Sequence, residues 1–199
     1  MPLAAYHLKG VLEAGCDEAG RGCLAGPVVA AAVILPHRVR LRGLDDSKKL
    51  SEGAREGLRP LIEEQALAWA VAIVDPSEID AVNILQASFR AMHRAVDALA
   101  IRPVHLLVDG NRFAPYPGIA HSCHIKGDGR FRAIAAASIL AKTHRDELMR
   151  RLHEAHPQYG WAVNKGYPTV DHRAAIARFG PSPHHRRSFR LLPGQPSLF

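Results

Sequence analysis

Two adjacent carboxylates, Asp17 and Glu18, stand just before a glycine-flanked arginine in the segment Asp-Glu-Ala-Gly-Arg-Gly. Carboxylate oxygens are the ligands that hard cations such as Mg²⁺ and Mn²⁺ prefer, and two neighbouring negative charges repel each other unless a cation compensates them. Gly20 and Gly22 leave the backbone beside Arg21 open to the close approach of a phosphate. The segment therefore indicates a metal-dependent site, although an acidic turn that ends in glycine explains the same residues.

Asp109 and Asp128 repeat this pattern, because each stands beside glycine and next to an apolar segment. Asp109 follows a short apolar run, and ligand sites in open α/β sheets gather at strand ends. Asp128 precedes an alanine-rich segment. Four acids in such contexts can hold two cations about 4 Å apart, which is the spacing used for attack on phosphodiesters. The alternatives are an Asp-Gly turn at Asp109 and a helix cap at Asp128.

The elements that position these acids follow from the apolar pattern. We expect a short buried strand over residues 11–16 that delivers Asp17 at its end. Since side chains alternate between the two faces of a strand, both acids can face one site only if the chain leaves strand geometry near Glu18. Strands that alternate with helices predict an α/β sandwich. Further strands are expected at residues 28–35, 68–74 and 105–108, and helices at 51–65, where Ser51 is a good N-cap, 84–99 and 134–140.

Length and charge limit the class of protein. A chain of 199 residues fits one domain, which we place at residues 1–190 with a flexible tail at 191–199. The net charge of +7 suggests a polyanionic partner. Three cysteines without paired spacing indicate neither a disulfide framework nor a zinc site, so we expect a cytoplasmic protein. The longest apolar run, residues 28–35, is too short to span a membrane.

Nine short motifs, in this order, resemble the type 2 ribonuclease H family of bacteria, ribonuclease HII. Each motif is weak alone, but the ordered set covers nearly the whole chain. The motifs are GCDEAGRG at residues 15–22, GPVVAAAVIL at 26–35, DSKKLS at 46–51, NIL at 83–85, VDGN at 108–111, KGD at 126–128, AAASILAK at 135–142, NKGYPT at 164–169 and GPSPHHRRSF at 180–189.

The resemblance implies an RNase H-like three-layer fold, with a central mixed five-stranded sheet flanked by helices and a helical C-terminal part. It implies an endonuclease that cleaves RNA in RNA/DNA hybrids and cuts 5′ of ribonucleotides embedded in duplex DNA, leaving 3′-hydroxyl and 5′-phosphate ends. Asp17, Glu18, Asp109 and Asp128 would be its catalytic metal ligands. They would hold two divalent ions, Mn²⁺ or Mg²⁺, when substrate is bound. We expect a monomer with no membrane contact.

The resemblance also implies the groups that hold the substrate. The Gly-Arg-Gly segment at residues 20–22 would sense the 2′-hydroxyl, the group that distinguishes RNA from DNA at a given sugar. Tyr167 would pack on the following deoxyribose, although an ordinary tyrosine at a loop edge is the alternative. Lys48 and Lys49 would contact backbone phosphate, although solvated lysines are common.

Two segments near the C-terminus allow more than one interpretation. His184, His185, Arg186 and Arg187 favour a basic surface for the duplex over a histidine-bound metal, with a plain solvated face as the alternative. Arg145 and Asp146 are expected to be structural. The last five residues resemble the peptide that docks bacterial proteins on the DNA polymerase sliding clamp, or they fold back on their own domain. These five are Gln195, Pro196, Ser197, Leu198 and Phe199.

Two other functions are alternatives to this one. Ribonuclease HIII shares the catalytic layout but carries an additional N-terminal substrate-binding domain, whereas 16 residues precede Asp17 in this chain. A non-catalytic module that only binds RNA/DNA hybrids would need at least one of the four acids to be replaced, and all four are present. The sequence therefore favours the enzyme.

Overall fold

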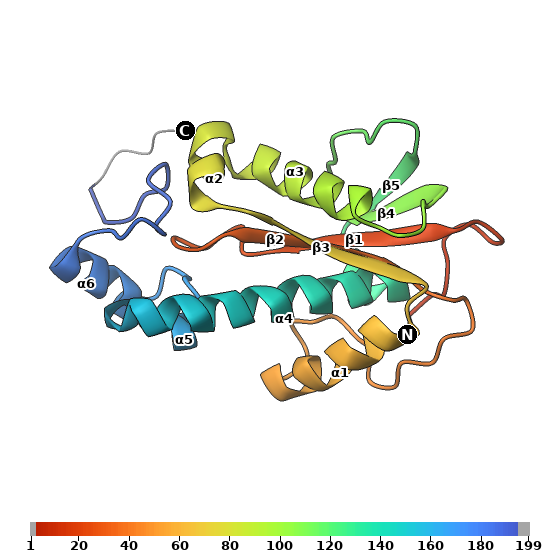
Figure 1. The fold of residues 1–199 in the computed structure, drawn as a ribbon, viewed down its shortest axis with the longest axis horizontal. Coiled ribbons are helices and arrows are strands. Elements are labelled where there is room, and N and C mark those ends of the chain that lie inside the picture. Colours follow the sequence, from red (N-terminus) through yellow and green to blue (C-terminus); the bar gives the residue numbers. More distant parts are fainter. Residues whose placement is uncertain (1–2, 195–199) are drawn as a thin grey trace.

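The computed structural model describes residues 3–194 and contains one five-stranded sheet between two layers of helices. Helices α2 and α3 cover one face of the sheet, α1 and α4 cover the other, and α5 and α6 lie at one end (Figure 1). The mixed, helix-flanked sheet confirms the predicted fold class. The elements are β1 Glu13–Ala19, β2 Val28–Ile34, α1 Glu52–Gln65, β3 Ala68–Val74, α2 Pro76–Val82, α3 Ile84–Asp97, β4 His105–Asp109, β5 Ala120–His124, α4 Arg132–Ala155, α5 Trp161–Asn164 and α6 Val170–Phe179, with short 3₁₀ turns η1 Gly127–Gly129 and η2 Pro157–Tyr159.

The strand order β3-β2-β1-β4-β5 places β1 at the centre of the sheet. β1 runs antiparallel to β2 and parallel to β4, so the ends of β1 and β4 meet at the same edge. The pairing of β1 with β4 extends to Cys16 opposite Val108. Asp17 and Asp109, the next residue on each strand, therefore come side by side at the end of this pairing.

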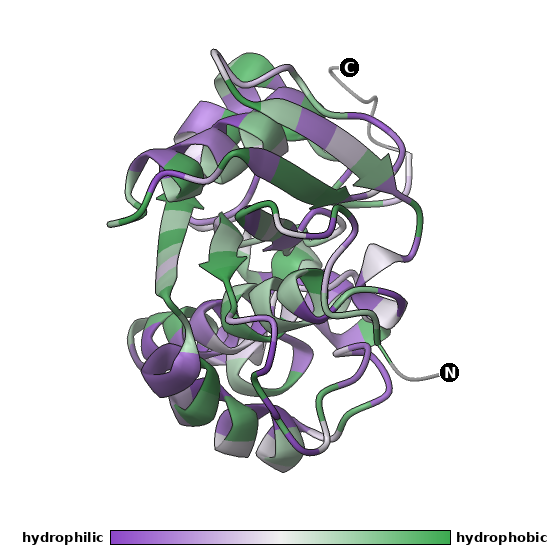
Figure 2. Cartoon of the chain, turned by 90° about the vertical axis from the view of Figure 1, so that its right-hand side faces the viewer, coloured by the Kyte–Doolittle hydropathy of each residue, from purple (hydrophilic) through white to green (hydrophobic). Residues whose placement is uncertain are grey.

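Two apolar layers hold the sheet between the helices. Alternate residues of β2 pack on opposite faces, with Ala30 in the layer under α3 and Ala31 in the layer under α4. Several strands are mainly hydrophobic, whereas the helices mix hydrophobic and hydrophilic residues (Figure 2). At Gly15 a Cβ atom would lie 2.1 Å from the backbone carbon of Ala133, so α4 packs directly on the backbone of β1. The small residues of β1 and α4 permit this close approach.

Most predicted elements are present, and the first strand is among them, but the predicted end of that strand was wrong. β1 begins at Glu13 and continues through Glu18 to Ala19, so the chain does not leave strand geometry beside the two acids. β2, β3, α1, α3 and β4 lie where the sequence indicates them, and Ser51 caps α1 through the backbone N–H of Ala54. The alanine-rich helix α4 is much longer than residues 134–140. The resemblance implied a five-stranded sheet and a helical C-terminal part, but the positions of β5, α2, α5 and α6 were not predicted.

The C-terminal segment remains packed beyond the last helix. Leu191 is buried against Trp161 and Met149, so the predicted tail does not begin at residue 191 as a loose segment. The clamp-binding prediction concerns residues 195–199, which lie outside the described residues. Among residues 3–194, no helix has the length and apolar character that crossing a membrane requires.

Candidate active site

A cavity of about 300 Å³ opens where β1 ends, between α4 and the segment that leads into α1. It brings together most residues that the sequence singled out: three of the four acids, the Gly-Arg-Gly segment, one lysine and the tyrosine. Its lining consists of Asp17, Glu18, Ala19, Gly20, Arg21, Gly22, Ser47, Lys48, Arg55, Asp109, Ser138, Lys142 and Tyr167. These residues come from five separate parts of the chain.

Asp17, Glu18 and Asp109 lie close enough to perturb one another. The pKa of Asp17 is raised well above its usual range by burial and then by the negative charges of Glu18 and Asp109. The pKa of Glu18 is raised by burial, although Arg21 opposes the shift. Burial also raises the pKa of Asp109, while the N–H of Gly127 opposes the shift. The protein thus concentrates negative charge where the charged form is disfavoured.

Each acid has a protein partner of its own. Asp17 accepts the backbone N–H of Glu18 at 2.7 Å, Glu18 binds Arg21 at 3.2 Å, and Asp109 accepts the N–H of Gly127 at 2.7 Å. Across residues 3–194, no three Asp, Glu, His or Cys side chains form a ready-made metal cluster. The donor chemistry nevertheless fits a hard divalent cation, because the set is all carboxylate and nearby cations compensate its mutual repulsion only in part.

Asp128 lies beside Asp109 but does not line the cavity. It is almost fully buried in η1, and its charge contributes to the raised pKa of Asp109. Lys48 reaches over it, with its Nζ atom 2.9 Å from Asp128 Oδ2. Lys49 instead pairs with Asp45 at 3.1 Å and is not part of the lining. The structure thus brings Lys48 to the site and leaves Lys49 outside it.

The Gly-Arg-Gly segment is held from beneath by two buried arginines. Gly20 has φ +96°, and a Cβ atom there would lie 2.0 Å from Arg145 Nε, so only glycine fits. Arg145 donates to the carbonyl oxygens of Ala25, Pro27 and Lys165. Arg186 donates to the carbonyl of Arg21 at 2.9 Å. Arg145 is therefore structural, as the sequence suggested.

The prediction that residues 184–187 form a basic duplex-binding surface was wrong for its two central residues. His185 and Arg186 have exposed fractions of 1% and 0%. Arg186 lies under the β1–β2 turn, where Gly26 also accepts a hydrogen bond from its guanidinium. The cationic group is compensated by backbone carbonyls rather than exposed to solvent.

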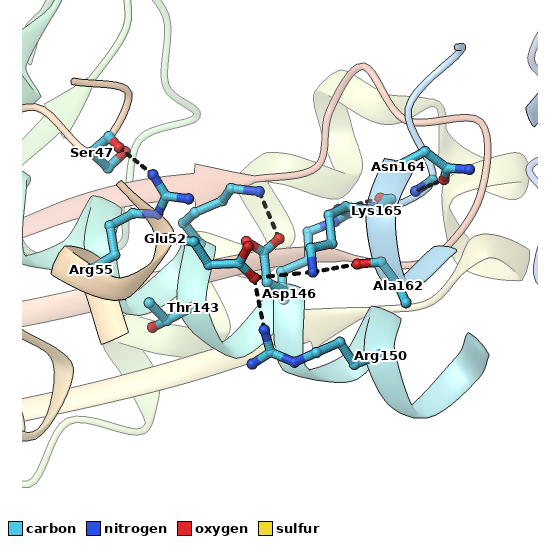
Figure 3. Close-up of polar contacts among 12 residues, drawn as sticks. Ser47, Glu52, Arg55, Thr143, Asp146, Arg150, Ala162, Asn164 and Lys165 are labelled. Carbon is cyan, nitrogen blue, oxygen red and sulfur yellow. Dashed lines mark hydrogen bonds and ion pairs between the residues drawn. The ribbon is translucent and has the colours of Figure 1, made fainter. Parts of the chain in front are cut away.

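Tyr167 lies at the rim of the cavity with 41% of its surface exposed. Lys142 Nζ is 5.8 Å from the centre of its ring. Lys165, two residues before Tyr167, forms an ion pair with Glu52 of α1 at 3.1 Å and donates a hydrogen bond to the carbonyl of Ala162 (Figure 3). The loop that carries Tyr167 is thereby tied to both α1 and α5.

Ser47, Arg55, Ser138 and Lys142 line the cavity although the sequence analysis gave them no role. Ser138, Lys142 and Asp146 follow one another at intervals of four residues on α4. Lys142 Nζ forms an ion pair with Asp146 Oδ1 at 2.6 Å. Polar residues at this spacing inside an alanine-rich helix share one face and could have been recognised. Ser47 is 2.8 Å from Ser138 through their hydroxyl oxygens, a contact between segments 91 residues apart that no local pattern reveals.

Comparisons with known proteins identify the family of the chain. A family model described as ribonuclease HII matches residues 14–192. A curated ribonuclease HII of Bacteroides thetaiotaomicron is 63% identical over 190 residues, covering 96% of this chain and 95% of that protein.

Solved structures show the same fold. The chain is similar to the ribonuclease HII in the complex with PCNA from Archaeoglobus fulgidus, with a TM-score of 0.78, 30% identity and coverage of 94% of this chain and 98% of that one. Bst-RNase HIII in complex with Mn²⁺ has a TM-score of 0.72 at 22% identity, covering 95% of this chain and 70% of that one. From the sequence match over nearly its full length, the chain belongs to the ribonuclease HII family of type 2 ribonuclease H endonucleases.

Proposed function

We propose that this hydrolase cleaves RNA in RNA/DNA hybrids and also cuts 5′ of single ribonucleotides embedded in duplex DNA, leaving 3′-hydroxyl and 5′-phosphate ends. One observation carries the proposal: a single cavity is lined by three carboxylates, an open Gly-Arg-Gly backbone and an exposed tyrosine. The carboxylates suit phosphodiester hydrolysis, and the Gly-Arg-Gly backbone and the tyrosine suit recognition of a sugar.

We propose that Asp17, Glu18, Asp109 and Asp128 hold two divalent ions, Mn²⁺ or Mg²⁺, with substrate bound. Such ions, when bound, activate the attacking water and neutralise the departing 3′-oxygen. The raised carboxyl pKa values support this role, since burial and then mutual repulsion raise them, and a bound cation would offset both by favouring the charged form. The Mn²⁺ bound by Bst-RNase HIII, which shares the fold, supports the choice of ion.

The chain's own residues would orient the substrate. Backbone groups of residues 20–22 can approach a ribose 2′-hydroxyl because Gly20 and Gly22 carry no side chain. The Tyr167 ring is free to pack on the next sugar, where a deoxyribose fits more closely than a ribose. Lys48 and Lys142 supply positive charge to a phosphate at the cavity. We expect Lys49 to contribute less, because it does not line the cavity.

The test is cleavage of a duplex that contains one ribonucleotide, beside an all-DNA duplex, with Mg²⁺ or Mn²⁺. We expect one cut, 5′ of the ribonucleotide, and none in the DNA. Asp109→Asn should lose cleavage but retain duplex binding, whereas Asp171→Asn, an exposed acid of α6 outside the cavity, should cleave like the wild type. Near wild-type turnover by Asp109→Asn would refute the assignment, and binding without cleavage by the wild type would instead indicate a hybrid-binding module.

We further propose that residues 195–199 dock on a sliding clamp. The PCNA complex of the similar Archaeoglobus fulgidus protein supports a clamp as partner. Deleting these five residues should abolish clamp pull-down and leave cleavage of a short duplex unchanged. Equal pull-down of the truncated protein would contradict the idea.

A further inference from the structure

The segment between β2 and α1 alternates basic and apolar residues in the sequence Arg-Val-Arg-Leu-Arg over positions 38–42. Val39 and Leu41 are partly buried and pack on the apolar layer between the sheet and α4. Arg38, Arg40 and Arg42 are exposed. The apolar contacts thus fix which way the segment faces and leave three guanidinium groups directed at solvent. We call these three residues the arginine strip.

The arginine strip differs from the arginines on the surfaces of the helices. Arg59, Arg94 and Arg150 each bind an acidic side chain at 2.8–2.9 Å. Within residues 3–194, no side chain of the strip takes part in an ion pair or a hydrogen bond. The nearest acids along the chain are already engaged, because Asp45 binds Lys49 and Asp46 accepts the backbone N–H of Lys48. The three charges remain uncompensated.

The strip lies next to the start of α4, and so does one edge of the cavity. Arg132, in the first turn of α4, donates to the carbonyl of Val39 at 3.0 Å. Asp128, just before α4, binds Lys48 at 2.9 Å. The segment between β2 and α1 is therefore held by two residues at or just before the start of α4, Asp128 and Arg132, which are only four positions apart. Arg42 lies six positions before Lys48 in the sequence. This distance is at most about 20 Å of extended chain.

We propose that the arginine strip binds backbone phosphates of the duplex arm that extends past the cleavage position. This inference rests on the proposed function, since the duplex in the cavity determines where its arm lies. Phosphates follow one another about every 3.4 Å along a strand, so the strip would be reached about 6 base pairs from the cut. A guanidinium group without an acidic partner can donate two hydrogen bonds to phosphate oxygens, and such a contact does not depend on the base sequence.

The experiment compares Arg38→Gln/Arg40→Gln/Arg42→Gln with wild type on duplexes that carry one ribonucleotide. One duplex has about 5 base pairs on each side, and two others extend one side or the other to about 18, beyond the reach of the strip. We expect kcat/KM of the variant to fall about tenfold on one of the extended duplexes and by less than twofold on the other two. The dependence of log kcat/KM on log salt should become shallower by about 2 to 3 for the affected duplex, since each phosphate contact contributes about 0.9.

A matched control removes three arginines from the α3 side of the sheet. Arg90→Gln/Arg94→Gln/Arg102→Gln changes the net charge equally but should leave the length dependence unchanged, because Arg90 and Arg94 are paired with Glu78 and Arg102 lies beyond the end of α3. Equal losses in both variants would mean a general charge effect and would overturn the proposal.

A second measurement keeps this proposal separate from the proposed function. Fluorescence anisotropy with an all-DNA duplex of about 36 base pairs measures phosphate binding without any cleavage. Weaker binding by the strip variant than by the control supports the strip, even if wild type fails to cut ribonucleotide-containing duplexes and the proposed function falls. Wild-type binding and wild-type kcat/KM on every duplex would show that the strip is only solvated.

Discussion

Two groups of buried charged side chains lie near the turn between β1 and β2, and they differ in how far the protein compensates their charge. The guanidinium of Arg145 donates three hydrogen bonds to backbone carbonyls, and that of Arg186 donates two. Asp17 and Glu18 lie on β1 just before the turn, and burial and mutual repulsion raise their pKa values. Every nitrogen of the Arg145 guanidinium has a carbonyl partner and Arg186 leaves only Nη2 without one, whereas the partners of the acid group do not prevent its pKa values from rising.

The difference indicates what each group contributes. A buried charge with full hydrogen bonding supports the fold around it, and its removal leaves several carbonyls without donors. Buried like charges that lack compensation reduce stability, and such groups are characteristic of functional sites. We therefore expect substitutions in the two groups to change stability in opposite directions.

The largest effect is expected for Arg145→Leu. The variant loses donors to the carbonyls of Ala25, Pro27 and Lys165, which should lower the free energy of unfolding by about 3–5 kcal/mol. Urea denaturation measures the change. Arg151→Leu, at an exposed arginine paired with Glu147 on the same helix, should cost less than about 0.5 kcal/mol. Similar losses in both variants would remove the basis of the comparison.

A pH effect of comparable size is expected at His185. Its pKa falls from 6.5 to about 4, through burial and then the neighbouring His172. Its Nδ1 accepts the N–H of Ser182 at 2.9 Å, so a proton at Nδ1 would displace that bond. Below pH 6.5 the unfolded chain gains a proton that the folded protein accepts only near pH 4. Stability is thus complete above 6.5 and is lost as the pH falls to 4, by about 3 kcal/mol.

Denaturation at several pH values between 7.5 and 4 tests this expectation. Carboxylates also titrate in this range, so the informative quantity is the difference between wild type and His185→Gln. The variant should be less stable at pH 7.5 and should lose less stability on acidification. A constant difference across the range would contradict the role of His185, and His37→Gln, at an exposed histidine, serves as the control.

The opposite sign is expected for Asp17→Asn. Removing this charge relieves repulsion with Glu18 and Asp109, while the amide oxygen can still accept the N–H of Glu18. The free energy of unfolding should rise by about 1 kcal/mol, and cleavage should be lost. Thermal denaturation without added metal and the single-ribonucleotide assay measure the two effects. A less stable variant would show that the acid group is compensated after all.

The sequence predicted those features that depend on local patterns. β2 is a continuous apolar run between prolines, and α1 begins at a serine cap, so both were identifiable without the fold. β5 carries His121 and Ser122 among few apolar residues, and no such pattern marks it. The two adjacent acids were expected to need a break in β1. The strand instead continues, and both reach the cavity where its pairing with β4 has ended.

Contacts between distant segments could not be predicted in this way. Arg186 has the composition of a surface residue, and its partner, the carbonyl of Arg21, is 165 positions away. Arg186 is buried because the β1–β2 turn lies against the C-terminal segment, where Ala25 pairs with His185. The acids of the site were identifiable because glycines lie within two positions of each of them, whereas the groups that hold the site in place carry no such local signature.

The smallest effect is expected for Ser138→Ala, because Ser138 supports the acid group without carrying a charge. Ser138 supplies a hydrogen bond that lowers the pKa of Asp17, and its hydroxyl also contacts Ser47 at 2.8 Å. Ser138→Ala removes this support, so the pKa of Asp17 should rise further and the stability should fall by about 1 kcal/mol. The rise in cleavage rate with pH should shift to higher pH, because Asp17 must be ionised to act. Ser88→Ala, which removes a buried hydroxyl from α3, should lower stability similarly without moving the pH profile. An unshifted profile for Ser138→Ala would mean that Ser138 packs in the core without supporting the acid group.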